Sequence, residues 1–282
     1  MQKHFNLRES MMQRIMPNYE KKRVTTRVIR HTRTKSTEIT DSTDSTISTD
    51  STDSTDSTDS NDPIDSSGII KKFTIFGERC SGTNYLEELI TTNFDIDVTW
   101  KYGWKHFFGF NDLKNRDDTL FIGVVRNPYD WINSLYKNPH HIPEHITFNI
   151  NSFLNSEFYS VEEGKEIMKD RNIYNPKKRY KNIFQLRYVK LDYLINHMPR
   201  LVKNYIFIKY EDLIEDFVGT MNKIQQKGLT IRENINYPVN ITYYKEQKHI
   251  HFKKDTTVRI PKEQIKNKLN THFEKDLLNY EI

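Results

Sequence analysis

Apolar and polar positions alternate with a regular rhythm after about residue 69, and this rhythm predicts strands and helices in turn. Residues 69–77 read as a strand that ends at a glycine, and residues 83–92 follow with helical spacing. An aromatic-rich strand is expected around residues 98–104, and the apolar run 119–125 predicts a strand buried on both faces. The next helix is expected to open at Pro128, a residue suited to a first helical turn.

The second half of this region continues the same alternation after an irregular stretch. Residues 138–182 are polar and broken by prolines, and we interpret them as an insertion on the substrate side. Helical periodicity returns over 183–195, a short strand is expected over 205–209, and a helix over 212–227. Strands that alternate with helices predict an α/β fold, a three-layer sandwich around a central, mostly parallel sheet.

The first 68 residues have a different composition. Residues 42–60 repeat Thr-Asp-Ser, and such side chains bury too little apolar area to offset the entropy lost on ordering. Before them lies a basic stretch, which we interpret as a solvated arm, with a short amphipathic helix as the alternative. We therefore expect a disordered N-terminal tail over 1–68 and one folded domain over 69–282.

Composition narrows the class of protein. Cys80 is the only cysteine, so neither an intrachain disulfide nor a cysteine-based zinc site can form, and a reducing compartment is expected. No apolar run is long enough to span a membrane and the N-terminus lacks a signal-peptide core, which favours a cytoplasmic protein without a transmembrane segment. The net charge of +5 does not by itself imply nucleic acid. The ten histidines show no metal-ligand spacing, so no metal is expected.

The first strand leads into a loop with two glycines, Gly77 and Gly82, before a helix begins. This layout is typical of phosphate loops, in which backbone N–H groups and a helix N-terminus face an anion. A plain structural turn is the alternative. A Walker A loop would have lysine where Thr83 stands, so ordinary ATP or GTP hydrolysis is disfavoured.

A second motif follows the buried strand 119–125. Arg126 stands at its carboxyl end, where ligands of open α/β sheets bind, and Ser134 lies in the helix that follows. A guanidinium at this place can grip a phosphate with two hydrogen bonds, and the serine hydroxyl can add another donor.

These motifs resemble those of the sulfotransferase superfamily, in the same order along the chain. Ser81-Gly82-Thr83 resembles the family's 5′-phosphosulfate loop, and Arg126-Asn127-Pro128 with Ser134 resembles its 3′-phosphate motif. Residues 206–213 are similar to the family's strand ending in Tyr-Glu-Asp-Leu, and residues 273–280 to its closing helix. The resemblance implies a P-loop-NTPase-like fold. It also implies transfer of a sulfuryl group from 3′-phosphoadenosine 5′-phosphosulfate (PAPS) to a hydroxyl or amine, without a metal.

The resemblance also implies a donor site. Its residues would be Arg79, Ser81, Gly82, Thr83, Asn84 and Tyr85 around the 5′ end, with Arg126 and Ser134 on the 3′-phosphate. Two departures stand out. Cys80 replaces the usual loop lysine, whose charge Arg79 or Lys105 could supply, and the glycine-rich C-terminal loop is absent, with Lys253 and Lys254 as substitutes or as ordinary solvated residues. Tyr85 or Trp131 could stack on adenine or belong to the core.

The pair Lys105-His106 follows the second expected strand, near the place of the family's catalytic histidine. His106 would accept the proton of the attacking hydroxyl, and Lys105 would stabilise charge on the transferred group. Glu78 is the alternative base, and a local hydrogen bond is the alternative role for His106. Arg187, on the helix before the strand 205–209, could face the ligand, but an arginine on an amphipathic helix is usually exposed, and we expect that here.

Three functions therefore remain open: a PAPS-dependent sulfotransferase, a P-loop nucleotide or small-molecule kinase, and a catalytically inactive binding module of the same fold. The acceptor, whether glycan, protein, lipid or small molecule, has no readable code in residues 138–182. The oligomeric state has none either.

Overall fold

The computed structural model describes residues 69–114, 116–244, 247–251 and 257–282. All of them fall within one unit of the chain, Asn61–Ile282. The predicted N-terminal tail over 1–68 lies outside the described residues.

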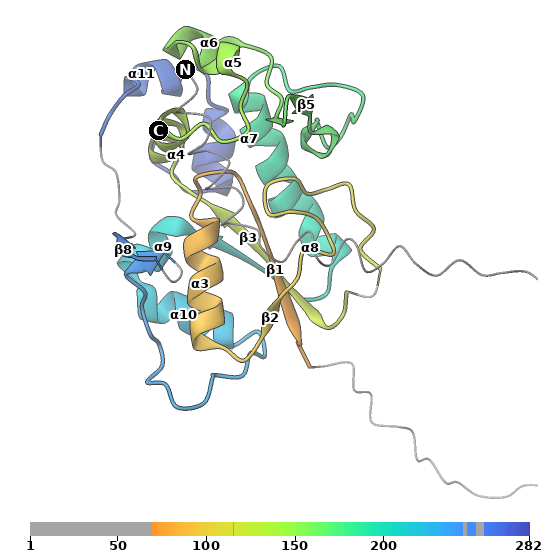
Figure 1. Ribbon diagram of the computed structural model, residues 1–282, viewed down its shortest axis with the longest axis vertical. Helices are drawn as coiled ribbons and strands as arrows, with labels where there is room; N and C mark the ends of the chain where they lie inside the picture. Colours follow the sequence, from red (N-terminus) through yellow and green to blue (C-terminus); the bar gives the residue numbers. More distant parts are fainter. Residues whose placement is uncertain (1–68, 115, 245–246, 252–256) are drawn as a thin grey trace, which may run out of the picture. The chain divides into compact units, whose positions relative to one another are not determined.

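A sheet of four parallel strands lies at the centre of this unit. Its strands are β1 (Lys72–Gly77), β2 (Asp97–Val98), β3 (Thr119–Val125) and β6 (Tyr205–Lys209), in the order β2-β1-β3-β6. Figure 1 shows β1 and β3 side by side in the middle. Their register pairs Gly77 with Val124, so both strands end at the same edge of the sheet.

Both faces of the sheet are covered, because apolar side chains occupy successive positions of the central strands. Every residue of β3 is buried. Leu120, Ile122 and Val124 face one core with helices α3, α9 and α10, whereas Phe121 and Val125 face a second core with α7, α8 and η3. The result is the three-layer α/β sandwich that the sequence predicts.

The helices and the remaining strands have the following bounds. The helical elements are α3 (Thr83–Asn93), α4 (Pro128–Lys137), α5 (Glu144–Thr147), α6 (Ile150–Asn155), η1 (Met168–Asp170), α7 (Ile183–Asp192), the π-turn η2 (Tyr193–His197), α8 (Met198–Leu201), α9 (Tyr210–Glu215), α10 (Phe217–Gln225), α11 (Lys262–Lys266) and the π-turn η3 (Phe273–Leu277). The short antiparallel pairs are β4 (Val161–Glu162) with β5 (Lys165–Glu166), and β7 (Tyr243–Tyr244) with β8 (Gln247–His251).

Two predicted elements differ from the structure. The aromatic segment 98–104 is not a strand beyond Val98, because Gly103 adopts a φ of 126° and a hydrogen bond from Phe107 N–H to Trp104 O closes a turn. The helix expected over 212–227 is two helices, α9 and α10, because helical geometry is interrupted at Asp216. The Asp216 carboxylate accepts the Gly219 N–H at 3.1 Å and so begins α10.

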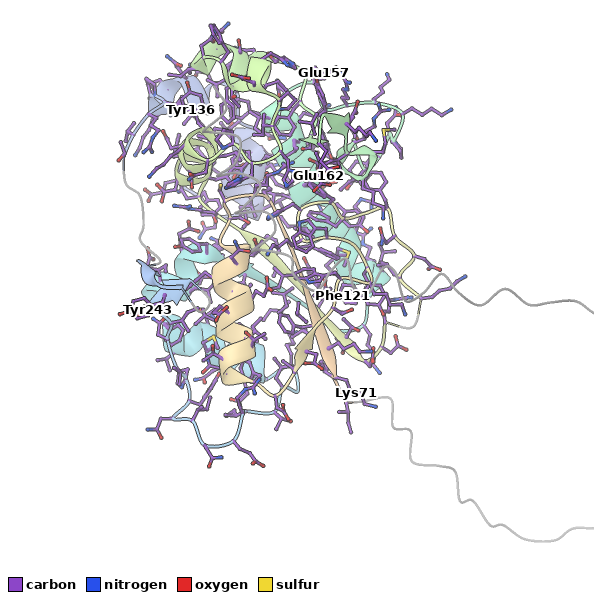
Figure 2. The ribbon with its side chains drawn as sticks, viewed as in Figure 1. Lys71, Phe121, Tyr136, Glu157, Glu162 and Tyr243 are labelled. Atoms are coloured by element: carbon purple, nitrogen blue, oxygen red, sulfur yellow. The ribbon has the colours of Figure 1, made fainter. Side chains whose placement is uncertain are left out.

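A third core joins α4, α6, α7 and α11 beyond the carboxyl edge of the sheet. Figure 2 labels Tyr136, on α4, in this part of the molecule, where its ring packs 5.0 Å from that of Phe153. The predicted insertion 138–182 supplies part of this core, including Phe153 and Tyr180. No helix in the described ranges is long and apolar enough to cross a bilayer.

Candidate donor-binding site

The loop between β1 and α3 depends on a glycine at its last position. Gly82 has a φ of 91°, and a Cβ there would lie 2.3 Å from the Tyr210 ring, so only glycine fits. Gly82 is the N-cap of α3, and because it has no side chain it cannot itself cap the helix. The N–H groups of the first turn of α3 are therefore directed at the loop, as in an anion site.

The loop is also fixed by its own hydrogen bonds. The Ser81 hydroxyl, fully buried, donates to the Glu78 carbonyl at 2.6 Å, and the Trp131 indole donates to the Arg79 carbonyl at 2.9 Å. Cys80 adopts a φ of 63° between these two anchors. The Ser81 side chain is thus used to hold the loop together. An anion at the loop would therefore contact its backbone N–H groups.

Arg126 and Ser134 meet this loop at Cys80. Arg126 follows β3, is 7% exposed, and donates from Nη1 to the Cys80 carbonyl at 3.1 Å. Its guanidinium lies 5.0 Å from the centre of the Tyr210 ring, and its Nε is buried without a hydrogen-bond partner in the described part of the chain. Ser134, on α4, lies near the Cys80 thiol; burial raises the pKa of this thiol, and Ser134 lowers it by less. The structure therefore brings together the two motifs that sequence places on separate strands.

The turn after Arg126 is held from two sides. The Asn127 side chain accepts the N–H groups of Tyr129 and Asp130 at the start of α4. The Asn127 N–H in turn donates to Glu211 at 2.9 Å, and Glu211 also accepts the Tyr280 hydroxyl at 2.9 Å. The closing C-terminal segment thus fixes the turn that carries Arg126.

Asn133 makes a second connection to the C-terminal segment, and sequence reasoning missed it. Its side-chain oxygen accepts the backbone N–H groups of Arg259 and Ile260 at 2.6 and 2.9 Å. Asn133 is 8% exposed and precedes Ser134 on α4. Helix α4, which holds Ser134, is therefore bonded to residues 259–260 of the C-terminal segment. Lys253 and Lys254, just before this segment, lie outside the described residues.

Lys105 lies beside the first turn of α3. Its carbonyl accepts the Gly77 N–H at 2.9 Å, and its ammonium, 6% exposed, bonds to Asn84 and pairs with Glu87 at 3.0 Å. The rings of Trp100 and Trp104 lie 5.4 and 5.1 Å from this ammonium. Lys105 is thus placed next to the loop, but its charge is matched by a carboxylate.

His106 is tied to the end of β1. Its Nδ1 lies 2.9 Å from the Gly77 carbonyl oxygen, and because a carbonyl can only accept, Nδ1 carries the proton and Nε2 has the free electron pair. Burial lowers the pKa of His106 well below its usual value, and the charges of Arg79, Lys105 and Lys190 add to that effect. The imidazole is therefore neutral at pH 7.

Arg79 is paired with an acidic residue of the insertion. Its side chain is 4% exposed, pairs with Asp170 at 2.7 Å and bonds to Ser160. Asp170 also pairs with Lys190, and although burial alone would raise the pKa of Asp170, these two cations lower it. The charge of Arg79 is therefore matched by Asp170 of the insertion.

Glu78 and Arg187 form a buried network that sequence reasoning did not anticipate. The expectation of an exposed Arg187 is wrong, since the residue is 1% exposed and donates from Nη1 to Glu78 at 2.8 Å. Burial raises the pKa of Glu78 to about 7. A signal existed, because Arg187 and Lys190 fall on the same helical face as Ile183 and Leu194, which are apolar.

Tyr85 and Trp131 belong to the core. Tyr85 is 5% exposed, donates its hydroxyl to Asn240 at 2.7 Å and packs its ring 6.2 Å from that of Tyr210. Trp131 is fully buried. In this structure Tyr85 therefore has a packing role. Thr83 is buried, 3% exposed, at the start of α3.

Comparison with known proteins gives matches among solved structures alone. No family model and no curated protein matches the chain. Among solved structures, it is similar to a mouse sulfotransferase, SULT7A1, complexed with PAP. The match has 15% sequence identity and a TM-score of 0.38, and covers 75% of this chain and 89% of that chain. A likeness of this size carries no conclusion about activity.

Proposed function

We propose that this protein binds PAPS at the carboxyl edge of β1 and β3 and transfers its sulfuryl group to a hydroxyl or amine. One observation carries the proposal: Arg126 bonds to the Cys80 carbonyl, and Ser134 lies near the Cys80 thiol, in the loop that leads into the first turn of α3. The first is suited to an anion bound by backbone N–H groups, and the second to a phosphate bound by a guanidinium and a hydroxyl. PAPS carries two such anionic groups on one adenosine.

The buried and unpartnered Nε of Arg126 supports this fit. Leaving a guanidinium nitrogen buried without an acceptor is unfavourable, and a phosphate oxygen would satisfy it. Thr83 and Asn84 would hold the 5′ end through the first turn of α3. Arg79 and Tyr85 are left out of the proposed site because their contacts are elsewhere.

For the transfer step we propose His106 as the base. The acceptor oxygen would attack sulfur, the bond from sulfur to the phosphate oxygen would break, and the hydroxyl proton would pass to Nε2 of His106. The Gly77 carbonyl holds the tautomer that this role needs. Lys105 would stabilise the departing phosphate after exchanging its bond to Glu87.

Isothermal calorimetry on the full chain tests the donor site. Adenosine 3′,5′-bisphosphate should bind more tightly than ADP with magnesium, and Arg126→Ala should weaken the bisphosphate roughly 100-fold, because two charge-assisted hydrogen bonds are lost. Arg200→Ala, on the exposed end of α8, is the control and should bind like the wild type. A preference for ADP would favour the kinase alternative instead.

Turnover with labelled PAPS over a panel of acceptors then separates an enzyme from an inactive binding module. His106→Ala should abolish turnover and retain bisphosphate binding. Persistent turnover in this variant would remove His106 as the base.

A further inference from the structure

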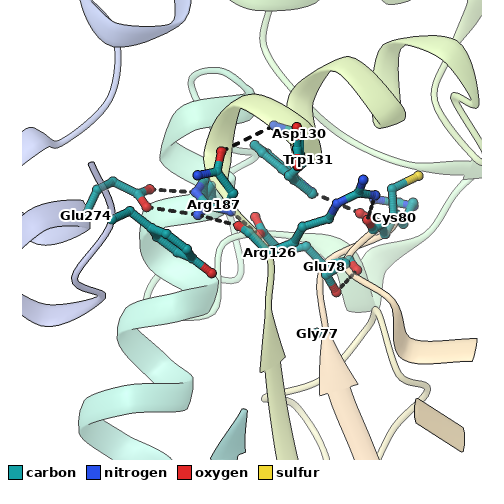
Figure 3. Close-up of polar contacts among 12 residues, drawn as sticks. Gly77, Glu78, Cys80, Arg126, Asp130, Trp131, Arg187 and Glu274 are labelled. Carbon is teal, nitrogen blue, oxygen red and sulfur yellow. Dashed lines mark hydrogen bonds and ion pairs between the residues drawn. The ribbon is translucent and has the colours of Figure 1, made fainter. Parts of the chain in front are cut away.

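Arg187 bonds to residues from three other parts of the chain: the end of β1, the end of β3 and η3. It comes from α7, is 1% exposed, and donates from Nη1 to Glu78, the first residue after β1, at 2.8 Å. Its Nε and Nη2 donate to the two oxygens of Glu274, on η3, at 2.6 and 2.9 Å. Figure 3 shows the guanidinium between these two carboxylates.

The same guanidinium also reaches the second strand. Nη2 donates to the carbonyl oxygen of Arg126, the first residue after β3, at 3.0 Å. Because Gly77 and Val124 are paired in the sheet, Glu78 and Arg126 leave it on neighbouring strands. One side chain thus bonds to the first residue beyond each of the two strands that carry the proposed donor site.

The plane of this guanidinium is fixed as well. It lies 4.9 Å from the centre of the Trp131 ring, and the Trp131 indole donates to the Arg79 carbonyl of the loop. A planar fork with several fixed donors can bridge two carboxylates and a carbonyl at once, which a lysine ammonium cannot do in the same geometry.

We infer that Arg187 is a positioning residue, which sets the spacing between the 5′ loop and the 3′-phosphate-binding Arg126 so that one donor molecule fits both. This inference rests on the proposed function. Arg187 does not touch the donor in this role. It acts through Glu78 and through the carbonyl of Arg126, whose guanidinium would hold the 3′-phosphate.

A positioning role has a consequence that a purely stabilising role lacks. Each anionic end of the ligand is bound by local groups that do not depend on Arg187. The loop is held by the bonds from Trp131 to the Arg79 carbonyl and from Ser81 to the Glu78 carbonyl, and Arg126 lies over the Tyr210 ring. The advantage of joining both ends in one molecule depends on the spacing between the two sites. Loss of the Arg187 fork should therefore remove that advantage and leave each separate end bound.

The experiment compares three ligands by calorimetry on the full chain: adenosine 3′,5′-bisphosphate, adenosine 5′-phosphate and adenosine 3′-phosphate. In Arg187→Lys the bisphosphate should weaken by about tenfold or more, whereas each monophosphate should stay within about threefold of the wild type. Arg179→Lys is the matched control. It alters another arginine paired with carboxylates, Glu157 and Glu166, and should change none of the three affinities.

A second variant, without charges in this network, provides the test if Arg187→Lys does not fold. Glu78→Gln with Arg187→Met and Glu274→Gln leaves no buried charge unpaired, and it should show the same selective loss. The inference is overturned if a folded variant keeps the full bisphosphate advantage, or if all three ligands weaken equally. If the wild type itself shows no advantage for the bisphosphate over the monophosphates, the proposed donor site fails, and this outcome is distinct.

Discussion

Replacing Glu78 by glutamine should change how the stability of the protein depends on pH. Burial is the main cause that raises the pKa of Glu78 from 4.5 to about 7, and Glu274 on η3 adds to it. Arg187 and Lys190 on α7 oppose the rise in the pKa of Glu78 without cancelling it, because burial is the larger effect. Between these two pKa values the folded state binds more protons at this site than the unfolded state.

The sign and size of the effect follow from that difference. Because the folded protein holds the extra proton, the contribution of Glu78 to stability falls as the pH rises from about 4.5 to 7, and stays low above 7. A shift of this size corresponds to about 3 kcal/mol. Glutamine is neutral throughout, so Glu78→Gln should gain stability relative to the wild type as the pH increases.

Urea unfolding of both proteins at pH 5 and pH 8 measures this gain. The free energy of unfolding of the variant, minus that of the wild type, should increase by up to about 3 kcal/mol between the two pH values. Glu162→Gln, an exposed residue of β4 labelled in Figure 2, should leave the difference flat. A difference for Glu78→Gln that does not change with pH would refute the reasoning.

Two further substitutions test the geometry of the loop and of α4. Gly82→Ala places a Cβ 2.3 Å from the Tyr210 ring at a φ of 91° and should cost about 2–4 kcal/mol in urea unfolding, whereas Gly228→Ala, at a φ of 93° in open space, should cost only about 1 kcal/mol. Equal losses would contradict the close contact. Asn133→Ala leaves two backbone N–H groups of the C-terminal segment without their acceptor, at about 1–3 kcal/mol each, and should accelerate hydrogen exchange at both. Unchanged exchange there would argue against the connection.

Local pattern predicts the central elements of this fold well, because their signals are local. The strand 119–125 is buried at every position and matches β3, and Pro128 begins α4 as its fixed φ favours. The aromatic stretch after Val98 misled the prediction, since the turn there depends on the positive φ of Gly103 and not on hydrophobicity. The break between α9 and α10 is also invisible to the hydrophobic pattern, because it depends on the side-chain cap at Asp216 while the helical pattern continues through it.

The loop between β1 and α3 and the position of Arg126 could also be predicted, because each directly follows a strand and belongs to a short motif. The charged network behind them could not. Arg187 lies far along the chain from both Glu78 and Glu274, and only the packing of α7 against the end of β1 makes them neighbours. The pairing of Arg79 with Asp170 is equally non-local, since Asp170 comes from the insertion.

In the proposed function, the charge near the sulfuryl end of the donor would decide whether this loop supports transfer. Cys80 brings none, since burial raises the pKa of its thiol. The charge of Lys105 is matched by Glu87 at 3.0 Å, and such a pair acts at a distance as a dipole, which attracts an anion less than a lone cation does.

Arg126, by contrast, forms no ion pair within the described residues, but it would serve the 3′ end of the donor. The sulfuryl end would then be left to the backbone N–H groups at the start of α3, where the N-cap Gly82 has no side chain, and to Lys105. Binding and transfer should therefore depend on different parts of the site. Affinity would come largely from Arg126, and rate from the amides of α3 and from how readily Lys105 exchanges Glu87 for the phosphosulfate.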